Sequence, residues 1–507
     1  MFPEDHARLT PDAPAVIDAD EDVRITFQEF SDRIYRLLDL LRARGLRDGD
    51  VVAVMMDNCA DYLVTTWAAF RGTMNYTAIG SDLRSSEVAY IIEDCGARAI
   101  VTDEAHAHVL EEALASSAHS VELRLISGST RPGWINLDEA LQGRPPEVPP
   151  NVGEGSDFLY SSGSTGRPKG IRMEPGKSAV STLYFPGFPA GVLLSTAPLH
   201  FSGPLRMCMV SQRSGGAVVL LRKFEPRSFL RAVERYRVTS AQMVPIMFTR
   251  LLKLSPEERA SYDVSSLQIV SHAGAPCPVD VKRQMLDWFG PVIYEGYSGS
   301  EFVGDLIIGP QEWLEHPGSV GKAANAHIKV VRADGSVAAP YEVGAVYFTE
   351  PRSFNYHNDA AKTASAHNEH GWATLGDIGY VDDDGYLYLT GRAAFTIVSG
   401  GANIYPQEIE DLLIAHPSVA DVAVFGVPND EWGEEVKAVI QLEPEASPAT
   451  DSDADALRAG LVTFCREHMA GYKCPRSIDF VDQLPRTTSG KMLKAKLRDQ
   501  YLAGVRV

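Results

Sequence analysis

The chain has 507 residues, more than one hydrophobic core usually holds, which predicts two or more packed units. Its 47 basic and 67 acidic side chains give a net charge of −20, which argues against binding nucleic acid or anionic membranes through a basic surface. The six cysteines form no CxxC pair, and no segment matches a signal peptide or a membrane span, so we expect reduced thiols in a soluble, cytoplasmic protein.

The first 150 residues alternate between helix and strand patterns. Thr26 and Glu29 form a capping-box pattern before apolar residues at helical spacing, and Gly45 ends that helix. This alternation predicts a largely parallel sheet with helices on its faces. The other elements expected here are strands at 51–56 and 98–103, a helix at 58–71 and a loop at 143–155.

From residue 156 the alternation resumes, and the last 116 residues (392–507) read as a separate small α+β unit. The elements expected in this part are a strand ending at 158–160, hairpins at 327–339 and 379–391, a helix at 406–415, strands at 421–427 and 437–443, an exposed acidic loop at 443–455 and a helix at 453–469.

The string SSGSTGRPKG at 161–170 carries three glycines, four hydroxyls and two cations directly after an expected strand. Glycines let backbone amides approach an anion, and Ser and Thr hydroxyls donate to phosphate oxygens. It is not a Walker A loop, because Arg167 and Pro168 separate glycine from Lys169. The string therefore predicts a phosphate-binding loop of another type.

Four more strings follow in order: YEGYSGSE (294–301), WATLGDIGYVDDDGYLYLTGR (372–392), SGGANIYPQEIE (399–410) and LPRTTSGK (484–491). With SSGSTGRPKG they resemble the motifs of the adenylate-forming superfamily of acyl-CoA synthetases, luciferases and carrier-protein adenylation domains. The resemblance spans nearly the whole chain. It implies an α/β fold: a large multi-subdomain N-terminal domain (1–391) of mixed and parallel sheets flanked by helices, a hinge (392–395) and a small α+β C-terminal lid (396–507).

The resemblance also implies a nucleotide site. Tyr297 would stack on adenine, Asp377 would accept hydrogen bonds from both ribose hydroxyls, and Arg392 would reach ribose or phosphate. The residues it implies for this role are Ser161, Ser162, Gly163, Ser164, Thr165, Gly166, Gly274, Ala275, Pro276, Glu295, Gly296, Tyr297, Ser298, Asp377 and Arg392.

Four residues take catalytic roles by the same resemblance. Glu301 would hold Mg²⁺, a hard cation that prefers carboxylate and phosphate oxygens, and Ser300 keeps the hydroxyl of the family's usual threonine. Lys169 would steady the departing pyrophosphate. Lys491 would bridge the substrate carboxylate and the α-phosphate. The implied cofactors and co-substrates are ATP, Mg²⁺ and coenzyme A.

The string PLHFSGPL (198–205) resembles the mouth of the family's acyl pocket, with Phe201 at the aromatic position and His200 before it. Amino-acid-activating relatives carry Asp where this chain has Ser202, so an amino acid is not expected. Gly274 would leave room in the pocket. We expect an apolar carboxylic acid, bulky ones included: fatty, aromatic or polycyclic.

At the hinge this chain departs from the family pattern, because Ala394 and Phe395 replace the usual charged pair. Gly400 and Gly401 would lie on the CoA side of the lid. We expect acyl-CoA formation, the alternative being a stand-alone adenylase that passes its acyl group to a carrier-protein phosphopantetheine or a partner ligase. A nucleotide-binding regulator is the rival from another class, and the sequence leaves open whether the protein is a monomer or a dimer.

Overall fold

The computed structural model describes residues 1–161, 168–173, 180, 191–301, 303–323, 327–351, 354–488 and 490–503. The chain forms two compact units. The first comprises Met1–Phe302, Gly309–Gln311 and Arg352–Ser365, and the second Val303–Ile308, Glu312–Pro351 and Ala366–Val507. The expected division into 1–391, a hinge and 396–507 stays a prediction.

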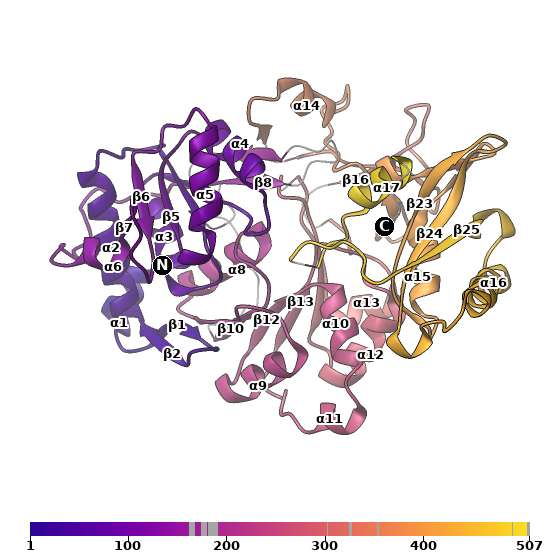
Figure 1. The fold of residues 1–507 in the computed structure, drawn as a ribbon, viewed down its shortest axis with the longest axis horizontal. Coiled ribbons are helices and arrows are strands. Elements are labelled where there is room, and N and C mark those ends of the chain that lie inside the picture. Colours follow the sequence, from indigo (N-terminus) through magenta and orange to yellow (C-terminus); the bar gives the residue numbers. More distant parts are fainter. Residues whose placement is uncertain are drawn as a thin grey trace. The chain divides into compact units, whose positions relative to one another are not determined.

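One sheet of the first unit, which includes β5, β6, β7 and β8 in Figure 1, has a parallel centre, as predicted from the βα alternation. At one edge of this sheet, β9 pairs antiparallel with β8 and β18 pairs antiparallel with β9. In spatial order its strands are β18 (Asn355–Tyr356), β9 (Lys169–Arg172), β8 (Ser156–Ser161), β4 (Asn75–Ala78), β3 (Val51–Met55), β5 (Ala97–Thr102), β6 (Leu123–Ile126) and β7 (Ile135–Asn136).

Strand β3 shows why the sequence has an unbroken apolar run at this point. Val52 and Val54 join the apolar cluster that includes α2 (Phe27–Ala43) and α3 (Ala60–Arg71). Val51, Ala53 and Met55 join a separate cluster that includes α4 (Ser85–Cys95) and α5 (Glu104–Ser116). Because both faces are covered by helices, both sets of alternating side chains must be apolar.

A second sheet of the first unit is parallel apart from its edge strand β2. The strands of this sheet that belong to the first unit have the order β14 (Ile293–Tyr297), β13 (Ile269–His272), β12 (Ser240–Met243), β10 (Val192–Ser195), β11 (Ala217–Leu220), β1 (Pro14–Asp18) and β2 (Val23–Thr26). In the described part of this unit, the remaining helices are α1 (Pro3–Leu9), α6 (Leu137–Leu141), α8 (Ser202–Arg213), α9 (Pro226–Tyr236), α10 (Pro245–Leu252), α11 (Pro256–Ala260), α12 (Val279–Phe289) and α14 (Ala360–Ser365).

Helices α3 and α8 connect the two sheets. Helix α3 contacts β3 and β4 of one sheet and β1 of the other, while α8 contacts β10 and β11. The buried indole of Trp67 on α3 donates to Gln212 Oε1 on α8 at 2.7 Å. A polar pair inside this apolar layer fixes how the two helices are rotated against each other.

The N-terminal predictions are confirmed at the level of single bonds. The Glu29 amide donates to Thr26 Oγ1 at 3.2 Å and the Thr26 amide donates to Glu29 Oε2 at 2.9 Å, which is a complete capping box. Helix α2 ends at Ala43, and Gly45 has the positive φ of 88° that favours glycine.

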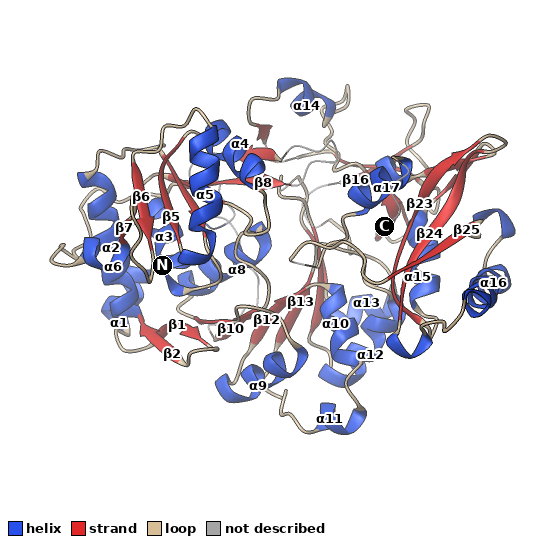
Figure 2. Cartoon of the chain, in the orientation of Figure 1, coloured by secondary structure: helices blue, strands red, loops and turns tan. Residues whose placement is uncertain are grey.

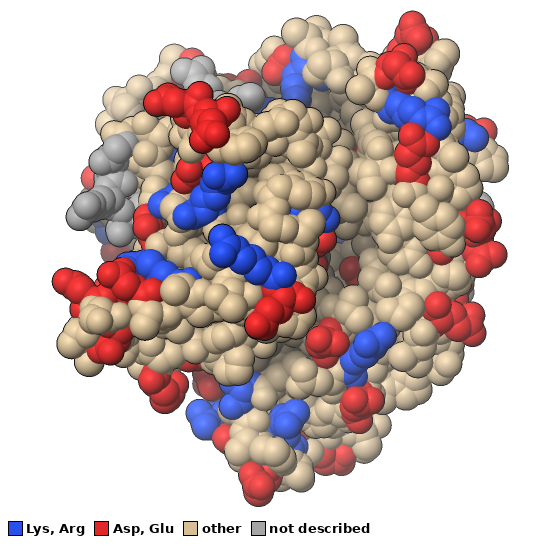
Figure 3. Space-filling model, turned by 90° about the vertical axis from the view of Figure 1, so that its right-hand side faces the viewer, with Lys and Arg blue, Asp and Glu red and all other residues tan. Residues whose placement is uncertain are grey.

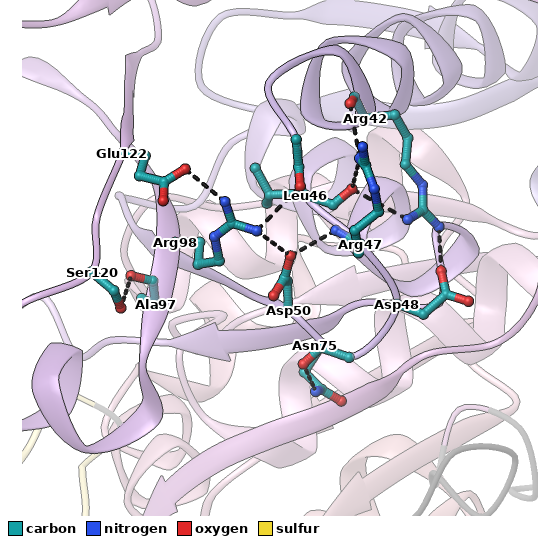
Figure 4. Close-up of polar contacts among 12 residues, drawn as sticks. Arg42, Leu46, Arg47, Asp48, Asp50, Asn75, Ala97, Arg98, Ser120 and Glu122 are labelled. Carbon is teal, nitrogen blue, oxygen red and sulfur yellow. Dashed lines mark hydrogen bonds and ion pairs between the residues drawn. The ribbon is translucent and has the colours of Figure 1, made fainter.

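Charged side chains fasten the loop after α2 to the neighbouring strands (Figure 4). Arg98 on β5 donates to Asp50 at 2.8 Å and to Glu122 at 2.6 Å, and Arg42 donates to Asp48 at 2.7 Å. These pairs are partly exposed, so each adds little free energy. Together they hold the chain in the position from which β3 begins.

The second unit has a four-stranded antiparallel sheet and a five-stranded sheet (Figure 2). The first has the order β16 (Ile328–Val331), β17 (Gly344–Phe348), β19 (Asp377–Val381) and β20 (Leu387–Arg392). The second has the order β22 (Ala402–Ile404), β21 (Ile397–Ser399), β24 (Gly433–Leu442) and β23 (Val419–Asn429), with β25 (Ser477–Val481) pairing β24. The other elements are β15 (Leu306–Ile308), α13 (Pro310–Glu315), α15 (Pro406–Ile414), α16 (Asp451–His468) and α17 (Lys494–Leu502), with 3-10 turns at Ala393–Phe395, Pro444–Ala446 and Gly471–Lys473.

Apolar clusters lie on both faces of the long β23–β24 ribbon. Val422 and Val424 belong to the cluster that includes α15 and α16. Ala423 and Phe425, on the opposite face, belong to the cluster that includes Leu497 of α17. All members of these two clusters come from residues 397–501.

Two expected elements differ from the structure. At 327–339 the turn forms, but its second arm is a single bridge between Val331 and Val337, because β16 pairs mainly with β17. The acidic loop at 443–455 is shorter than expected, since Thr450 caps α16 and the helix begins at Asp451. None of the helices within the described ranges combines the length and apolarity needed to cross a bilayer.

Candidate active site

The expected phosphate loop leaves the sheet between β8 and β9. Ser161 is the last residue of β8, and Lys169, the first of β9, lies opposite it in the antiparallel pair. The predictions for Ser162, Gly163, Ser164, Thr165 and Gly166 fall outside the described residues. The structure thus fixes where the loop begins and ends.

Buried polar contacts hold the base of this loop. Asp157 on β8 accepts from Arg206 Nε on α8 at 2.8 Å, and both side chains are almost fully buried. Tyr160 donates its hydroxyl to Asp94 Oδ2 on α4 at 2.6 Å. Removing one partner of the Asp157–Arg206 pair would leave a buried charge uncompensated, so this ion pair fastens β8 to the helix that begins in the acyl-pocket motif.

Lys169, Glu301 and Tyr356 meet beside the loop. The Tyr356 hydroxyl donates to Glu301 Oε1 at 2.8 Å, and Lys169 Nζ lies 6.0 Å from the centre of the Tyr356 ring. Burial lowers the pKa of Lys169, as does the charge of Lys362, whereas Asp359 and Glu301 raise it. Two of the four expected catalytic residues are therefore neighbours in the first unit.

Three of the four expected acyl-pocket residues, His200, Phe201 and Ser202, lie at the start of α8. The rings of His200 and Phe201 have their centroids 4.2 Å apart, and Ser202 Oγ lies 3.4 Å from Ser300 Oγ. Burial lowers the pKa of His200 to about 4, against a smaller opposing effect of Asp82. His200 is therefore neutral near pH 7, and it brings no charge to this mouth.

Gly274, Ala275 and Pro276 form the turn after β13. Gly274 has a φ of +84°, a left-handed conformation that side chains other than glycine rarely adopt. Gly296 lies beside this turn, since a Cβ on it would be 3.8 Å from Ala273 Cβ. The turn after β13 and the last residues of β14 lie at the carboxyl edge of a parallel sheet. Ligands of α/β folds bind at this edge.

Glu295, predicted to bind nucleotide, directs its carboxylate to Lys282 on α12. Lys282 Nζ lies 2.7 Å from Glu295 Oε2, and both side chains are buried. Burial raises the pKa of Glu295, whereas Lys282 lowers it; burial lowers the pKa of Lys282, whereas Glu295 raises it. The pair anchors the strand that carries Gly296, Tyr297 and Ser298, whose nucleotide roles stay predictions.

In the second unit, the two residues expected at the ribose contact each other. Arg392 Nε lies 2.9 Å from Asp377 Oδ1, at paired positions of β20 and β19. Asp377 is buried, whereas the side chain of Arg392 is 54 % exposed. The hairpin predicted at 379–391 is confirmed, and its register brings these residues together.

The expected hinge residues form a 3-10 turn directly after β20. Arg498 of α17 donates to the Ala394 carbonyl at 3.1 Å, and the cationic groups of Lys494 and Arg498 lie 5.7 and 5.6 Å from the centre of the Phe395 ring. Phe395 thus packs under cationic side chains of its own unit.

The expected CoA-side glycines form the tight turn of the β21–β22 hairpin. Gly400 and Gly401 have φ values of +56° and +81°. The ring of Trp432 lies 2.8 Å from the position that a Cβ of Gly400 would occupy. The turn therefore requires glycine at position 400, for both conformation and space.

Lys491 lies on an exposed loop of the second unit. Its amide donates to Thr487 Oγ1 at 3.1 Å, and its carbonyl accepts from the Thr487 amide at 2.8 Å. Arg486 holds the loop through two bonds of 2.6 Å to the Asp421 carboxylate. The expected site residues are therefore divided: Lys169, Ser300, Glu301 and Tyr297 belong to the first unit, and Asp377, Arg392 and Lys491 to the second.

Three residues of the site region are missed by the sequence predictions. The buried Asn58 amide donates to the carbonyls of Ala197 and Leu221 at 3.1 and 3.0 Å and accepts from the Leu199 amide at 2.8 Å, which fixes the segment before His200. Lys282 had a detectable signal, since it lies on the apolar face of α12 with Met285 and Phe289. Asn58 and Tyr356 had none, because their partners are far away in sequence.

On the face drawn in Figure 3, Lys and Arg side chains lie among Asp and Glu side chains. A mixed face of this kind differs from the basic surface that binding to nucleic acid requires.

Two family models match the chain. The model described as AMP-binding enzyme matches residues 3–355, and the AMP-binding enzyme C-terminal domain matches residues 408–491. The first match contains the motifs at 161–170 and 294–301, and the second contains the motif at 484–491.

Named relatives are similar over the full length. Feruloyl-CoA synthase of an Amycolatopsis species is 33% identical over 509 residues, covering 99% of this chain and 98% of the relative. The structure of o-succinylbenzoate CoA synthetase from Bacillus subtilis, in complex with its acyl-adenylate, superposes with a TM-score of 0.82 at 27% identity, covering 98% and 97% of the two chains. ATP-bound MatB from Rhodopseudomonas palustris gives a TM-score of 0.82 at 27% identity over 100% of both chains.

Proposed function

Because the chain belongs to the AMP-binding enzyme family, we propose that it converts an apolar, aromatic carboxylic acid into its CoA thioester. The general activity is that of an acid–thiol ligase: ATP activates the acid as an acyl-adenylate, and CoA then takes the acyl group. The observation that carries the choice of acid is the full-length similarity to a feruloyl-CoA synthase.

In the first half-reaction a carboxylate oxygen attacks the α-phosphorus of ATP, and the bond to the β-phosphate oxygen breaks to release pyrophosphate. In the second, the CoA thiolate attacks the acyl carbon, the bond to AMP breaks, and the thiol proton passes to solvent. The first step brings anions together, so it depends chiefly on positioning and charge neutralisation. Lys169 and Lys491 are the lysines we assign to that task.

The residues present fit a magnesium ion, which takes hard oxygen ligands. We assign its protein ligand to Glu301, whose carboxylate is close enough to Lys169 to raise the pKa of that lysine. When bound, magnesium would offset negative charge on the triphosphate.

The other nucleotide contacts are assigned as the sequence predicts. We assign Tyr297 to stacking on adenine, and Asp377 with Arg392 to binding of the ribose.

Two features of the pocket mouth support an apolar aromatic acid. The adjoining rings of His200 and Phe201 offer flat surface, and His200 is neutral. Ser202 stands where an aspartate would pair an α-amino group. The relative with the acyl-adenylate complex is also named for an aromatic acid. Cytoplasmic location and a carrier-protein acceptor stay predictions.

A panel of acids tests the assignment. We expect acid-dependent exchange between ATP and labelled pyrophosphate, with hydroxycinnamic and benzoic acids giving a higher kcat/KM than fatty acids of equal carbon number. A single added methylene in an apolar pocket is worth only about 1–3 kcal/mol, so acids are compared in size-matched pairs. A higher kcat/KM for the fatty acids would refute the proposal that the substrate is an aromatic acid, and it would leave the proposed ligase activity unchanged.

The atypical hinge predicts an imbalance between the half-reactions. Phe395 packs under Lys494 and Arg498, and such a contact favours one arrangement of a rotating lid. We expect Phe395→Asp to raise the rate of thioester formation about threefold or more and leave pyrophosphate exchange unchanged. Acyl-AMP and acyl-CoA are measured separately by HPLC. If the wild-type protein and the Phe395→Asp variant gave equal acyl-CoA yields, Phe395 would not be the cause of an imbalance between the half-reactions.

A further inference from the structure

Tyr356 occupies a fixed position at the edge of the sheet that carries the phosphate loop. It belongs to the short strand β18 and pairs with Ile171 of β9, whose first residue is Lys169. Its amide donates to Thr363 Oγ1 at 3.0 Å. The tyrosine backbone is therefore held on two sides.

The residues that follow Tyr356 fasten the same segment to helix α4. His357 Nε2 contacts the Asp94 carbonyl at 3.1 Å, and Asn358 donates to Asp94 Oδ1 at 3.1 Å. The other oxygen of the Asp94 carboxylate accepts from Tyr160, at the base of the phosphate loop. One aspartate thus ties the strand before the loop to the segment that carries Tyr356.

The hydroxyl of Tyr356 reaches Glu301, the carboxylate to which we assign magnesium, at 2.8 Å. The ring is partly buried and packs against Ile171 and Met173, so packing alone explains the ring. Packing does not explain the hydroxyl group, because a phenylalanine at this position would make the same apolar contacts without it. A hydrogen bond from a fixed donor restricts the rotation of a carboxylate and so presents its oxygens in one orientation.

We propose that Tyr356 is a positioning residue that orients Glu301 for the metal–nucleotide complex. The inference rests on the proposed role of Glu301. A hydrogen-bonding partner behind a metal ligand contributes about 10–100-fold to metal affinity. The effect of losing the hydroxyl should therefore be seen in the magnesium dependence of ATP binding, and not in the affinity for the acid.

The test is Tyr356→Phe, studied by calorimetric titration of ATP at a series of MgCl₂ concentrations without acid, so that no turnover occurs. The quantity compared is the magnesium concentration at the midpoint of the increase in ATP affinity. We expect this concentration to be about tenfold higher in the variant than in the wild-type protein. Saturating magnesium should return the affinity to the wild-type value, which a misfolded variant would not do. The KM for the acid should stay the same. No recovery at saturating magnesium would overturn the proposal.

Two further variants separate the possible failures. Tyr236→Phe is the matched control, because the Tyr236 hydroxyl also lies 3.0 Å from a carboxylate oxygen, that of Asp22, and it should behave as wild type. If Glu301→Gln changes the magnesium dependence and Tyr356→Phe does not, the role of Tyr356 is refuted and that of Glu301 stands. If neither changes it, the metal role of Glu301 fails and the role of Tyr356 fails with it.

Discussion

Replacing Lys491 with alanine is expected to lower acid-dependent pyrophosphate exchange about 100-fold or more, a loss of some 3 kcal/mol in transition-state stabilisation. Two anions approach each other in adenylation, and a cation placed between them stabilises the charge distribution of the transition state. Lys491 is exposed, and its backbone is held by Thr487 on a loop that Arg486 anchors. Alanine therefore removes the ammonium group without disturbing a core.

The measurement is pyrophosphate exchange for the first half-reaction, with thioester formation from pre-formed acyl-AMP and CoA measured separately. We expect the second rate to be nearly unchanged. Lys496→Ala is the control, since this lysine is also exposed and lies in α17 of the same unit. Exchange near the wild-type rate in the Lys491 variant would remove this residue from the mechanism.

The largest expected loss of stability follows from Lys282. Lys282→Met leaves Glu295 buried without its cation, and removing one partner of a buried ion pair costs about 3–5 kcal/mol. Replacing both residues, as in Lys282→Met with Glu295→Leu, should recover most of that loss, because no buried charge then remains. Urea unfolding of the single and double variants gives the coupling between the two sites.

The pH dependence of the single variant gives a second check. Burial raises the pKa of Glu295, and loss of Lys282 removes the charge that opposes this shift. An acid whose folded-state pKa lies above its unfolded value loses stability as pH rises between the two values. The Lys282→Met variant should therefore be least stable near neutral pH and regain stability on acidification. As a control, Arg227→Met removes an exposed partner of Glu258 and should change little.

A single variant as stable as wild type would show that water reaches Glu295 and that the pair does not anchor β14. A double variant as unstable as the single one would attribute the loss to packing of the lysine stem instead of to charge.

Features encoded by neighbouring residues were predictable from the sequence. The capping box at Thr26 and Glu29 involves residues three apart, and the strand at 51–56 is defined by its own apolar run. The motif strings carried the family assignment, because phosphate chemistry demands glycines, hydroxyls and cations close together in the chain.

Features that depend on register were not predictable. Lys282 meets Glu295 only because α12 presents one particular face to β14, and Tyr356 meets Glu301 only because β18 adds to the edge of β9. The arm expected after Val331 is lost for a similar reason: β17, which comes later in the chain, takes the pairing edge of β16. Tertiary pairing overrides local pattern in each case.

The two apolar clusters on the β23–β24 ribbon have a mechanical consequence. Every member of both clusters comes from residues 397–501, so this segment carries its own interior. Because both clusters are internal to the segment, a rotation of the segment as one body would leave them intact. If residues 396–507 rotate as the lid that the sequence predicts, a substitution at Phe395 is expected to shift the balance between its orientations while these two clusters stay packed.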